Sequence, residues 1–467
     1  MEFASTTFLF IFLPAAFLLT LVLPWAKARS WLLIAASLVF YAWGELYYVI
    51  LMLASAAVNF FIALWIGRRE GKGRKLPLVI AAVFNIGLLA VFKYAAFAVN
   101  SVNSVFGASL PVPGIPSPLG ISFFTFQTLS YVIDVYRGDV KPTREIGKFL
   151  LYISFFGQLV QGPIIRWSFI EKALDEIKIT VDGAAEGIRL FIIGLAMKLI
   201  IANTMGRVTS FVWSLAPSEL NAAFAWAGAI CFLLQIYFDF AGYSQMAIGI
   251  GMMFGLPIPK NFDHPYIAYS MTDFWRRWHI TLSRWFRDYV YIPLGGNRKG
   301  AFRTGVNKIA VFLLTGLWHG ANWTFVLWGA YNGLFLLAEN YLKKTKLRLP
   351  KIITWVYTII AVTVGFVIFN SPDVSYAFSM IGSMFSRFDI GGGTIAALSS
   401  VLKPTVIAAL IAGAAAATPI ASVIDGKLED KPKLRFALRY SAALVLLVLC
   451  LFFIASGNYN PSIYTQF

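Results

Sequence analysis

Long apolar runs constrain the fold of this 467-residue chain more than any other feature of its sequence. A run of about 20 apolar residues can cross a bilayer as a helix, and soluble domains carry roughly 25% charged residues. Here charged residues make up 13% of the chain and hydrophobic residues 59%. We therefore expect an all-α, polytopic integral membrane protein with one domain over residues 1–467. The expected spans are Thr6–Trp25, Trp31–Trp43, Leu46–Ile66, Leu76–Ala96, Leu119–Tyr136, Ile188–Trp213, Ala223–Phe254, Ile352–Asn370, Pro404–Ile424 and Ser441–Ser456.

Basic loops between the runs predict the orientation, because Lys and Arg accumulate on the cytoplasmic side of a membrane. The basic stretches are Arg68–Lys75, Arg137–Lys148, Lys260–Lys308, Lys343–Lys351 and Lys427–Arg439. Placing them inside makes both termini extracytoplasmic. The first run lacks a preceding basic segment, so we interpret it as a retained helix and not as a cleaved signal peptide.

Two further apolar segments cannot cross under this assignment, because basic loops flank both of them. They are Phe149–Ile165 and Ile309–Asn340, and they carry backbone breakers near mid-depth: Gly157, Gly162, Gly316 and Gly320. Irregular backbone at membrane depth survives only inside protein or beside a wet cavity. We therefore expect two re-entrant hairpins around a central cavity.

The stretch Asp273–Arg298 reads DFWRRWHITLSRWFRDYVYIPLGGNR and predicts a two-sided helix near residues 273–293. One arc holds Phe274, Trp275, Trp278, Leu282, Trp285, Phe286, Tyr289 and Ile292, and the other holds Arg276, Arg277, Arg284 and Arg287. Such a helix is typical of a membrane surface, with rings in the acyl region and guanidinium groups among phosphates. We expect it on the cytoplasmic face.

Two histidines stand out as candidates for chemistry. His319 lies in the apolar stretch GLWHGANW and is either a general base for an attacking hydroxyl or a helix-packing residue. Asn322 follows closely and either orients the imidazole, donates to an oxyanion or satisfies a freed backbone carbonyl. His279, at the edge of the aromatic arc, either assists with protons or only anchors the surface helix.

The four arginines of the helix, Arg276, Arg277, Arg284 and Arg287, are candidates for binding a phosphorylated donor such as a CoA thioester. Each one singly is equally suited to anchoring lipid headgroups.

Other polar and ionisable groups are assigned structural roles. Asp134, Asp239, Gln158 and Gln161 lie in or near apolar runs, where we expect buried polar networks rather than catalysis. The two cysteines, Cys231 and Cys450, are interpreted as buried apolar residues, and no metal-ligand spacing is visible. The net charge of +17 is assigned to topology and anionic lipid, not to nucleic acid.

Five long motifs resemble a known family. They are GISFFTFQTLSYVIDVYRG at 120–138, SFFGQLVQGPIIR at 154–166, YFDFAGYSQMAIGIGMMFG at 237–255, the arginine-rich stretch above, and LTGLWHGANWTFVLWGAYNG at 314–333. With them the chain resembles the membrane-bound O-acyltransferase family over nearly its whole length. The GGNR ending at 295–298 resembles the bacterial branch that acetylates extracellular polysaccharides such as alginate.

This resemblance implies a ring of about ten or eleven transmembrane helices with re-entrant segments around a funnel. It maps the family's essential histidine onto His319 and the second onto His279. The final SIYTQF resembles the aromatic tail of that branch, which makes Tyr464 the candidate acyl relay, although a threonine replaces a common aromatic.

The resemblance also implies substrates and partners. The donor is an acyl thioester on the cytoplasmic side, most simply acetyl-CoA, with no bound cofactor. An extracytoplasmic acetyltransferase of the SGNH type is the partner, a polysaccharide is the final acceptor, and the location is the bacterial cytoplasmic membrane.

Two alternatives remain open. A transporter fold predicts internal symmetry, and none is visible in the sequence. A non-catalytic scaffold subunit of a polysaccharide export or modification complex predicts that His319→Ala leaves acylation intact.

Overall fold

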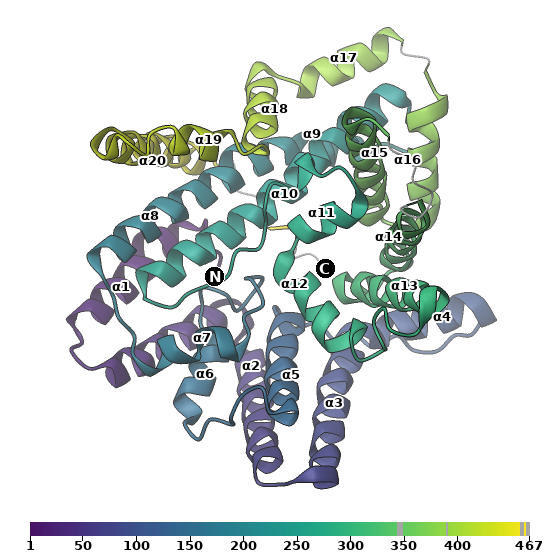
Figure 1. The fold of residues 1–467 in the computed structure, drawn as a ribbon. Helices are drawn as coiled ribbons and strands as arrows, with labels where there is room; N and C mark the ends of the chain where they lie inside the picture. Colours follow the sequence, from purple (N-terminus) through teal and green to yellow (C-terminus); the bar gives the residue numbers. More distant parts are fainter. Residues whose placement is uncertain (343–348, 389–390, 458–461, 464–467) are drawn as a thin grey trace. The chain divides into compact units, whose positions relative to one another are not determined.

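The computed structural model describes residues 1–467 except 343–348, 389–390, 458–461 and 464–467, and every regular element in the described part is helical (Figure 1). This confirms the predicted all-α class. The helices form two compact units, Met1–Phe191 with Ser244–Lys260 and Ile192–Tyr243 with Asn261–Phe467. Each unit is described by itself.

The first unit contains α1 (Leu13–Val22), α2 (Ala26–Gly67), α3 (Lys75–Leu89), α4 (Ala95–Phe106), α5 (Ile121–Arg137), α6 (Ile146–Ser154) and α7 (Trp167–Asp175), with short π or 3-10 turns at Phe8–Phe12, Gly71–Arg74 and Ala90–Tyr94. Helix α2 is 42 residues long and bends at Glu45, whose φ of −139° and ψ of 49° are not helical. The spans expected at 31–43 and 46–66 are therefore two parts of one kinked helix.

The predicted hairpin at 149–165 is helical only to Ser154, where α6 ends. Turns and irregular backbone follow as far as Arg166. The carbonyl of Tyr152, freed near this helix end, accepts hydrogen bonds from the side-chain amides of Gln127 at 2.6 Å and Gln158 at 2.7 Å. Buried side chains thus replace the lost helix partners, which confirms a structural role for Gln158. The re-entrant path itself stays a prediction.

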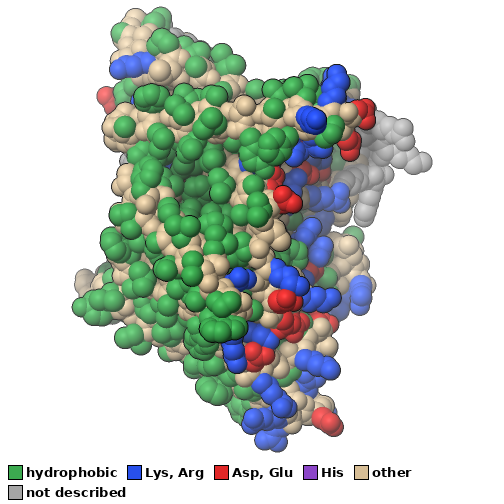
Figure 2. Space-filling model, turned by 90° about the vertical axis from the view of Figure 1, so that its left-hand side faces the viewer, with side chains coloured by type: hydrophobic (Ala, Val, Ile, Leu, Met, Phe, Trp, Pro, Cys, Tyr) green, Lys and Arg blue, Asp and Glu red, His purple; other side chains and the backbone are tan. Residues whose placement is uncertain are grey.

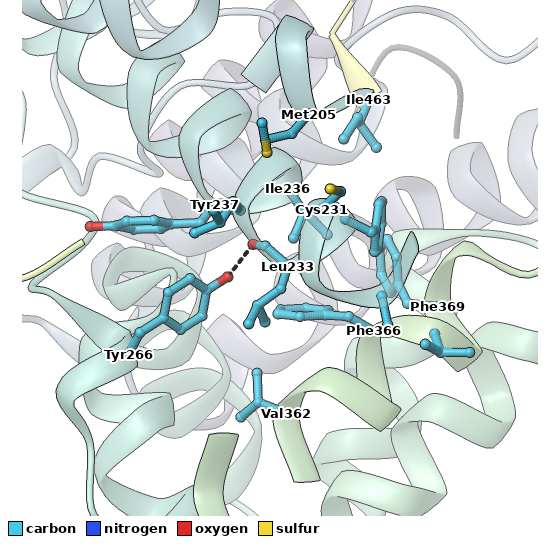
Figure 3. Packing of buried hydrophobic residues seen from close by; sticks show 14 of the residues in the cluster. Met205, Cys231, Leu233, Ile236, Tyr237, Tyr266, Val362, Phe366, Phe369 and Ile463 are labelled. Atoms are coloured by element: carbon cyan, nitrogen blue, oxygen red, sulfur yellow. Dashed lines mark hydrogen bonds between the residues drawn. The ribbon is translucent and has the colours of Figure 1, made fainter. Parts of the chain in front are cut away.

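Helices α8 (Val181–Ala196) and α10 (Ala222–Met253) contribute to both units. The second unit adds α9 (Asn203–Trp213), α11 (Met271–Arg277), α12 (Ile280–Phe286), α13 (Gly300–His319), α14 (Trp323–Leu342), α15 (Lys351–Asn370), α16 (Val374–Ser386), α17 (Gly392–Val401), α18 (Pro404–Ala416), α19 (Ile420–Gly426) and α20 (Pro432–Ala455), with turns at Met197–Ala202, Pro265–Ile267 and Arg287–Tyr291. Its core is one large aromatic and aliphatic cluster, part of which Figure 3 shows. Cys231 is buried in this cluster, and Cys450 is buried on α20, as expected for apolar residues.

Helices α13 and α14 form a close helical hairpin over the second predicted re-entrant segment. A Cβ atom at Gly316 would lie 2.1 Å from the Phe325 carbonyl oxygen, and one at Gly329 would lie 2.4 Å from the Phe312 carbonyl oxygen. Only glycine permits such an approach of two backbones. The hairpin turns at 320–322, so His319 is the last residue of α13. Its entry and return on one membrane side stay a prediction.

Several described helices have the length and composition of membrane spans. Five qualify, or six if the pair α17 and α18, bent by 75°, is one span. On the face in Figure 2, hydrophobic side chains cover a broader area than Lys, Arg, Asp and Glu side chains do. These features agree with a polytopic membrane protein, but the number of ten or eleven spans stays a prediction. Helix α5, for example, has 17 residues, most of them buried within the protein.

Candidate active site

The arginine-rich stretch is not one continuous helix, so the prediction of a single two-sided helix near residues 273–293 was wrong, while its location on the cytoplasmic face stays a prediction. Helix α11 ends at Arg277, α12 begins at Ile280, and His279 between them has a left-handed backbone with φ 44°. A non-glycine residue in this region is uncommon and is a frequent feature of functional sites. Most side chains of the aromatic arc are buried within the protein: Phe274, Trp278, Leu282, Trp285, Phe286 and Tyr289. Ile292 alone of the arc's described residues is mostly exposed.

Asn261 makes the break possible without losing hydrogen bonds. Its backbone carbonyl accepts from the Ile280 N–H at 2.9 Å, and its side-chain Oδ1 accepts from the Thr281 N–H at 3.2 Å and the Thr281 hydroxyl at 2.9 Å. The first N–H groups of α12, which have no partner within their own helix, are thereby satisfied. A residue 18 positions upstream thus supplies the cap.

The same Asn261 oxygen fixes the tautomer of His279. Oδ1 lies 3.2 Å from His279 Nδ1, and it must be an acceptor because the Thr281 N–H can only donate. Nδ1 therefore carries the hydrogen, and Nε2 presents its lone pair. Among the residues that the structure describes, no group hydrogen-bonds to Nε2. His279 is thus poised as a hydrogen-bond acceptor.

The His279 ring is buried among aromatic side chains, with Phe240 at 4.6 Å and Trp318 at 5.9 Å between ring centroids. This burial lowers the pKa of the imidazole to about 3, because the apolar surroundings disfavour its charged form. His279 therefore stays uncharged at neutral pH.

His319 lies beside the same tryptophan. Its ring centroid is 5.0 Å from that of Trp318 and 5.2 Å from those of Trp328 and Phe369, all with nearly perpendicular planes. Trp318 therefore contacts both imidazoles, and the two histidines come together from elements 40 residues apart. His319 is 5% exposed, so little of it is open to bulk water.

A cavity of about 210 Å³ brings the two histidines to one space. Both line it, together with Arg276 of α11 and Lys308 of α13. A wider hollow of about 630 Å³ shares Thr272, Arg276, Ser283 and Lys308 with it. The wider hollow adds Arg287, Tyr291 and Asn297. The shared residues make the two spaces neighbours: the histidines line only the narrower one, Arg287 lines only the wider one, and Arg276 and Lys308 line both.

The four predicted donor-binding arginines divide into two pairs. Arg276 and Arg287 line the wider hollow, although Arg287 also bonds to Asp288 at 2.6 Å. Arg277 instead bonds to Asp273 at 3.1 Å and to the Asp263 carbonyl at 3.3 Å. Arg277 and Arg284 are not among the described lining residues of either space.

Lys308 is a lining residue that the sequence reasoning missed. It shares one face of α13 with Val311, Phe312, Thr315 and His319, all of which line the histidine cavity. The spacing of three and four residues places them on one helix face. Counting back from His319 at this spacing would have found Lys308.

Glu339 on α14 holds the short helix that carries Arg276. Its carboxylate accepts from the backbone N–H of Met271 at 2.5 Å and of Thr272 at 3.0 Å, and from the Thr272 hydroxyl at 2.7 Å. Trp275 also donates from Nε1 to Asn332 Oδ1 at 3.3 Å. The N-terminal N–H groups of α11 are thus tied to α14, which keeps Arg276 at the cavity.

The structure assigns Asn322 the third of its expected roles. Its side-chain amide donates to the Pro372 carbonyl at 2.9 Å, and its Oδ1 accepts from the Thr324 N–H at 3.1 Å. Asn322 therefore holds the turn of the hairpin, and both ends of its amide are occupied. The bond to Pro372 uses one of the two hydrogens on the amide nitrogen, so a part in oxyanion binding stays a prediction.

Two other predicted positions have different outcomes. Asp239 is a member of a buried polar network, as expected, and pairs with Lys198 of the π-helix Met197–Ala202. Tyr464 lies outside the described residues.

Known proteins resemble this chain along most of its length. The model of the membrane-bound O-acyltransferase family matches residues 140–383. The chain is 42% identical to a probable alginate O-acetylase AlgI of Azotobacter vinelandii over 83% of its length and 79% of the relative's. It is 36% identical to the corresponding Pseudomonas putida protein over both full lengths. It is 35% identical to a peptidoglycan O-acetyltransferase of Helicobacter pylori over 82% of its length and 79% of the relative's.

Proposed function

Because the chain belongs to the membrane-bound O-acyltransferase family and is a membrane O-acyltransferase, we propose that it transfers acetyl groups from acetyl-CoA toward an extracellular or cell-envelope polysaccharide such as alginate. The names of its AlgI relatives support the acetyl group and the polymer. The thioester arrives from the cytoplasm, where the basic loops are expected.

The observation that carries this proposal is the cavity that joins two histidines to a cationic hollow. A CoA thioester needs phosphate contacts and a site where its carbonyl meets a hydroxyl. Arg276, Arg287 and Lys308 supply cationic donors at the wider hollow, where charge-assisted hydrogen bonds to phosphate are strong. His319 and His279 line the narrower space, where the thioester carbonyl would lie.

His319 acts as the general base. It takes the proton of the attacking hydroxyl while the hydroxyl oxygen forms its bond to the thioester carbon. As the carbon–sulfur bond breaks, the protonated ring returns that proton to the departing sulfur, and CoA leaves as a free thiol. His279 lines the same space with the lone pair of Nε2, which can accept a hydrogen bond from a donor other than this hydroxyl, because the single hydroxyl hydrogen goes to His319.

The acceptor side of the reaction is assigned to the chain end. Tyr464 would receive the acetyl group and pass it to an extracytoplasmic SGNH-type acetyltransferase, which modifies the polymer. Both termini then face the outside of the bacterial cytoplasmic membrane. The motif match of the final SIYTQF supports this assignment.

The test is substitution of the base. His319→Ala and His319→Gln should lower polymer acetylation by about 10²–10⁴-fold, because that is the usual contribution of a general base. Trp323→Ala, at an exposed tryptophan just past the same turn, is the control and should keep activity. Normal acetylation in both His319 variants, with the proteins expressed and folded, would leave the scaffold alternative standing.

A further inference from the structure

A buried ion pair lies in the second unit away from the proposed chemistry. Lys198 donates from Nζ to Asp239 Oδ1, and their side chains are 7% and 2% exposed. Neither is among the described residues that line the histidine cavity or the wider hollow. Taking two charges out of water is unfavourable unless the remaining lone pairs are also satisfied. The second carboxylate oxygen therefore needs donors of its own.

Those donors come from the end of the chain. The Ser462 hydroxyl donates to Asp239 Oδ2 at 2.6 Å, and the Ile463 N–H donates to the same oxygen at 2.9 Å. Both residues lie beyond α20, more than 220 positions from Asp239. The Asp239 carboxylate thus accepts one side-chain donor and one backbone donor from the same distant segment. A site that binds a peptide would make the same two kinds of hydrogen bond.

An apolar pocket completes the contact. Ile463 is 7% exposed and belongs to the core cluster of the second unit. Figure 3 shows it on the side of the cluster that holds Met205 and Cys231. The tail is therefore held by hydrogen bonds to a charged group and by burial of a branched side chain, each of which would be lost on release.

The anchor is connected to the histidine site by packing. The residue after Asp239 is Phe240, whose ring contacts His279. The cluster that buries Ile463 also includes Phe369 and Trp328, which contact the ring of His319. The tail anchor and both histidines thus share one packed region of the second unit.

We propose that the Lys198–Asp239 pair is a docking site for this chain's own C-terminal segment, and that docking of Ser462 and Ile463 positions the chain end for acyl transfer. This inference rests on the proposed function, since Tyr464 is the next residue in the sequence. Lys198, Asp239 and Ser462 are positioning residues and take no part in bond making. A purely structural pair would instead affect stability alone.

The first experiment measures whether the tail is docked in the working protein. Ile463→Cys is placed in a background of Cys231→Ala and Cys450→Ala, and its rate of labelling by a maleimide is compared with that of Ser456→Cys, at an exposed position. Docking predicts labelling at position 463 that is slower by about tenfold or more, as expected from hydrogen bonds to a charged group. Adding Lys198→Met with Asp239→Leu should bring the two rates together. Equal rates without that double change would overturn the proposal.

The second experiment separates positioning from folding. Ser462→Ala should lower polymer acetylation by about tenfold while acetyl-CoA binding and the melting temperature stay near those of wild type, because one charge-assisted hydrogen bond is lost. Ser462→Thr keeps the hydroxyl and should restore transfer. Ser456→Ala, whose hydroxyl bonds locally to the Phe453 carbonyl at 2.9 Å, is the matched control.

The outcomes distinguish the two proposals. If His319→Ala abolishes acetylation while Ser462→Ala and Ile463→Asp transfer normally, the base assignment stands and the docking role is wrong. If His319→Ala acetylates normally, the proposed function fails, and the labelling rates still decide whether the tail is docked.

Discussion

Replacing Asn261 by alanine should destabilise the second unit and release His279. Its Oδ1 accepts from three donors, and the residue is 1% exposed. The Thr281 hydroxyl can rotate to another acceptor, but the Thr281 N–H and the His279 Nδ1–H lose their partner. A buried donor without a partner costs about 1–3 kcal/mol. Two of them give a loss of about 2–6 kcal/mol in the free energy of unfolding.

Asn261→Asp separates the lost hydrogen bonds from the lost side chain. Aspartate keeps an acceptor oxygen at the same place, so its melting temperature at pH 7.5 should lie well above that of Asn261→Ala. Its carboxylate faces the Nδ1–H of His279 and should raise the pKa of that imidazole, since a nearby negative charge favours the protonated ring.

The assay is thermal unfolding of the purified protein in detergent, together with acetyl transfer from acetyl-CoA. Asn103→Ala is the control, because this partly buried asparagine also makes two hydrogen bonds, both to Leu110 at 2.9 Å and both exposed to solvent. Its effect should stay within about 0.5 kcal/mol. If Asn261→Ala melts with the control and transfers acetyl groups normally, the Asn261 oxygen does not hold His279 in place.

Two further outcomes are expected. Lys308→Met should raise the KM for acetyl-CoA by about tenfold or more, because a charge-assisted contact to phosphate is lost. Arg284→Gln is the control and should change the KM little. Equal KM values for the two variants in enzyme assays would exclude Lys308 from the donor site. As the pH falls below about 6.5, His279 becomes protonated in the unfolded chain. In the folded chain it stays neutral, because burial lowers its pKa to about 3. The free energy of unfolding of wild type should therefore fall by about 1.4 kcal/mol per pH unit relative to that of His279→Asn. Melting curves at pH 7.5 and 5.5 measure this difference, and parallel acid losses in both proteins would contradict a buried, uncharged His279.

Local sequence patterns predicted the hairpin of α13 and α14 but not the break before α12. Gly316 and His319 interrupt one apolar run, so the hairpin could be predicted from residues within that run alone. The break depends on Asn261, which supplies a carbonyl and a side-chain oxygen from 18 positions upstream. A helical projection assumes a constant angle per residue. It therefore cannot predict one left-handed residue whose conformation is stabilised by contacts with a distant segment.

The arginines show the same limit on the candidate site. The pairing of Arg277 with Asp273 could be predicted from their spacing of four residues. That Arg276 lines the hollow could not be predicted in this way, because it depends on how α11, which carries Arg276, is held by Glu339 of α14. The charge pattern led to the proposal that this stretch binds phosphate, and the tertiary contacts show which of its arginines line the hollow.

The structure also ranks the two histidines, which the sequence alone left uncertain. A general base works best when its pKa lies near the operating pH. Burial holds the pKa of His279 at about 3, far below that range, and Asn261 keeps its proton on Nδ1. His279 is therefore suited to accepting a hydrogen bond and poorly suited to carrying a proton. Since both rings contact Trp318 and line one cavity, we propose that His319 carries the proton, while His279 accepts a hydrogen bond from another donor in the same space.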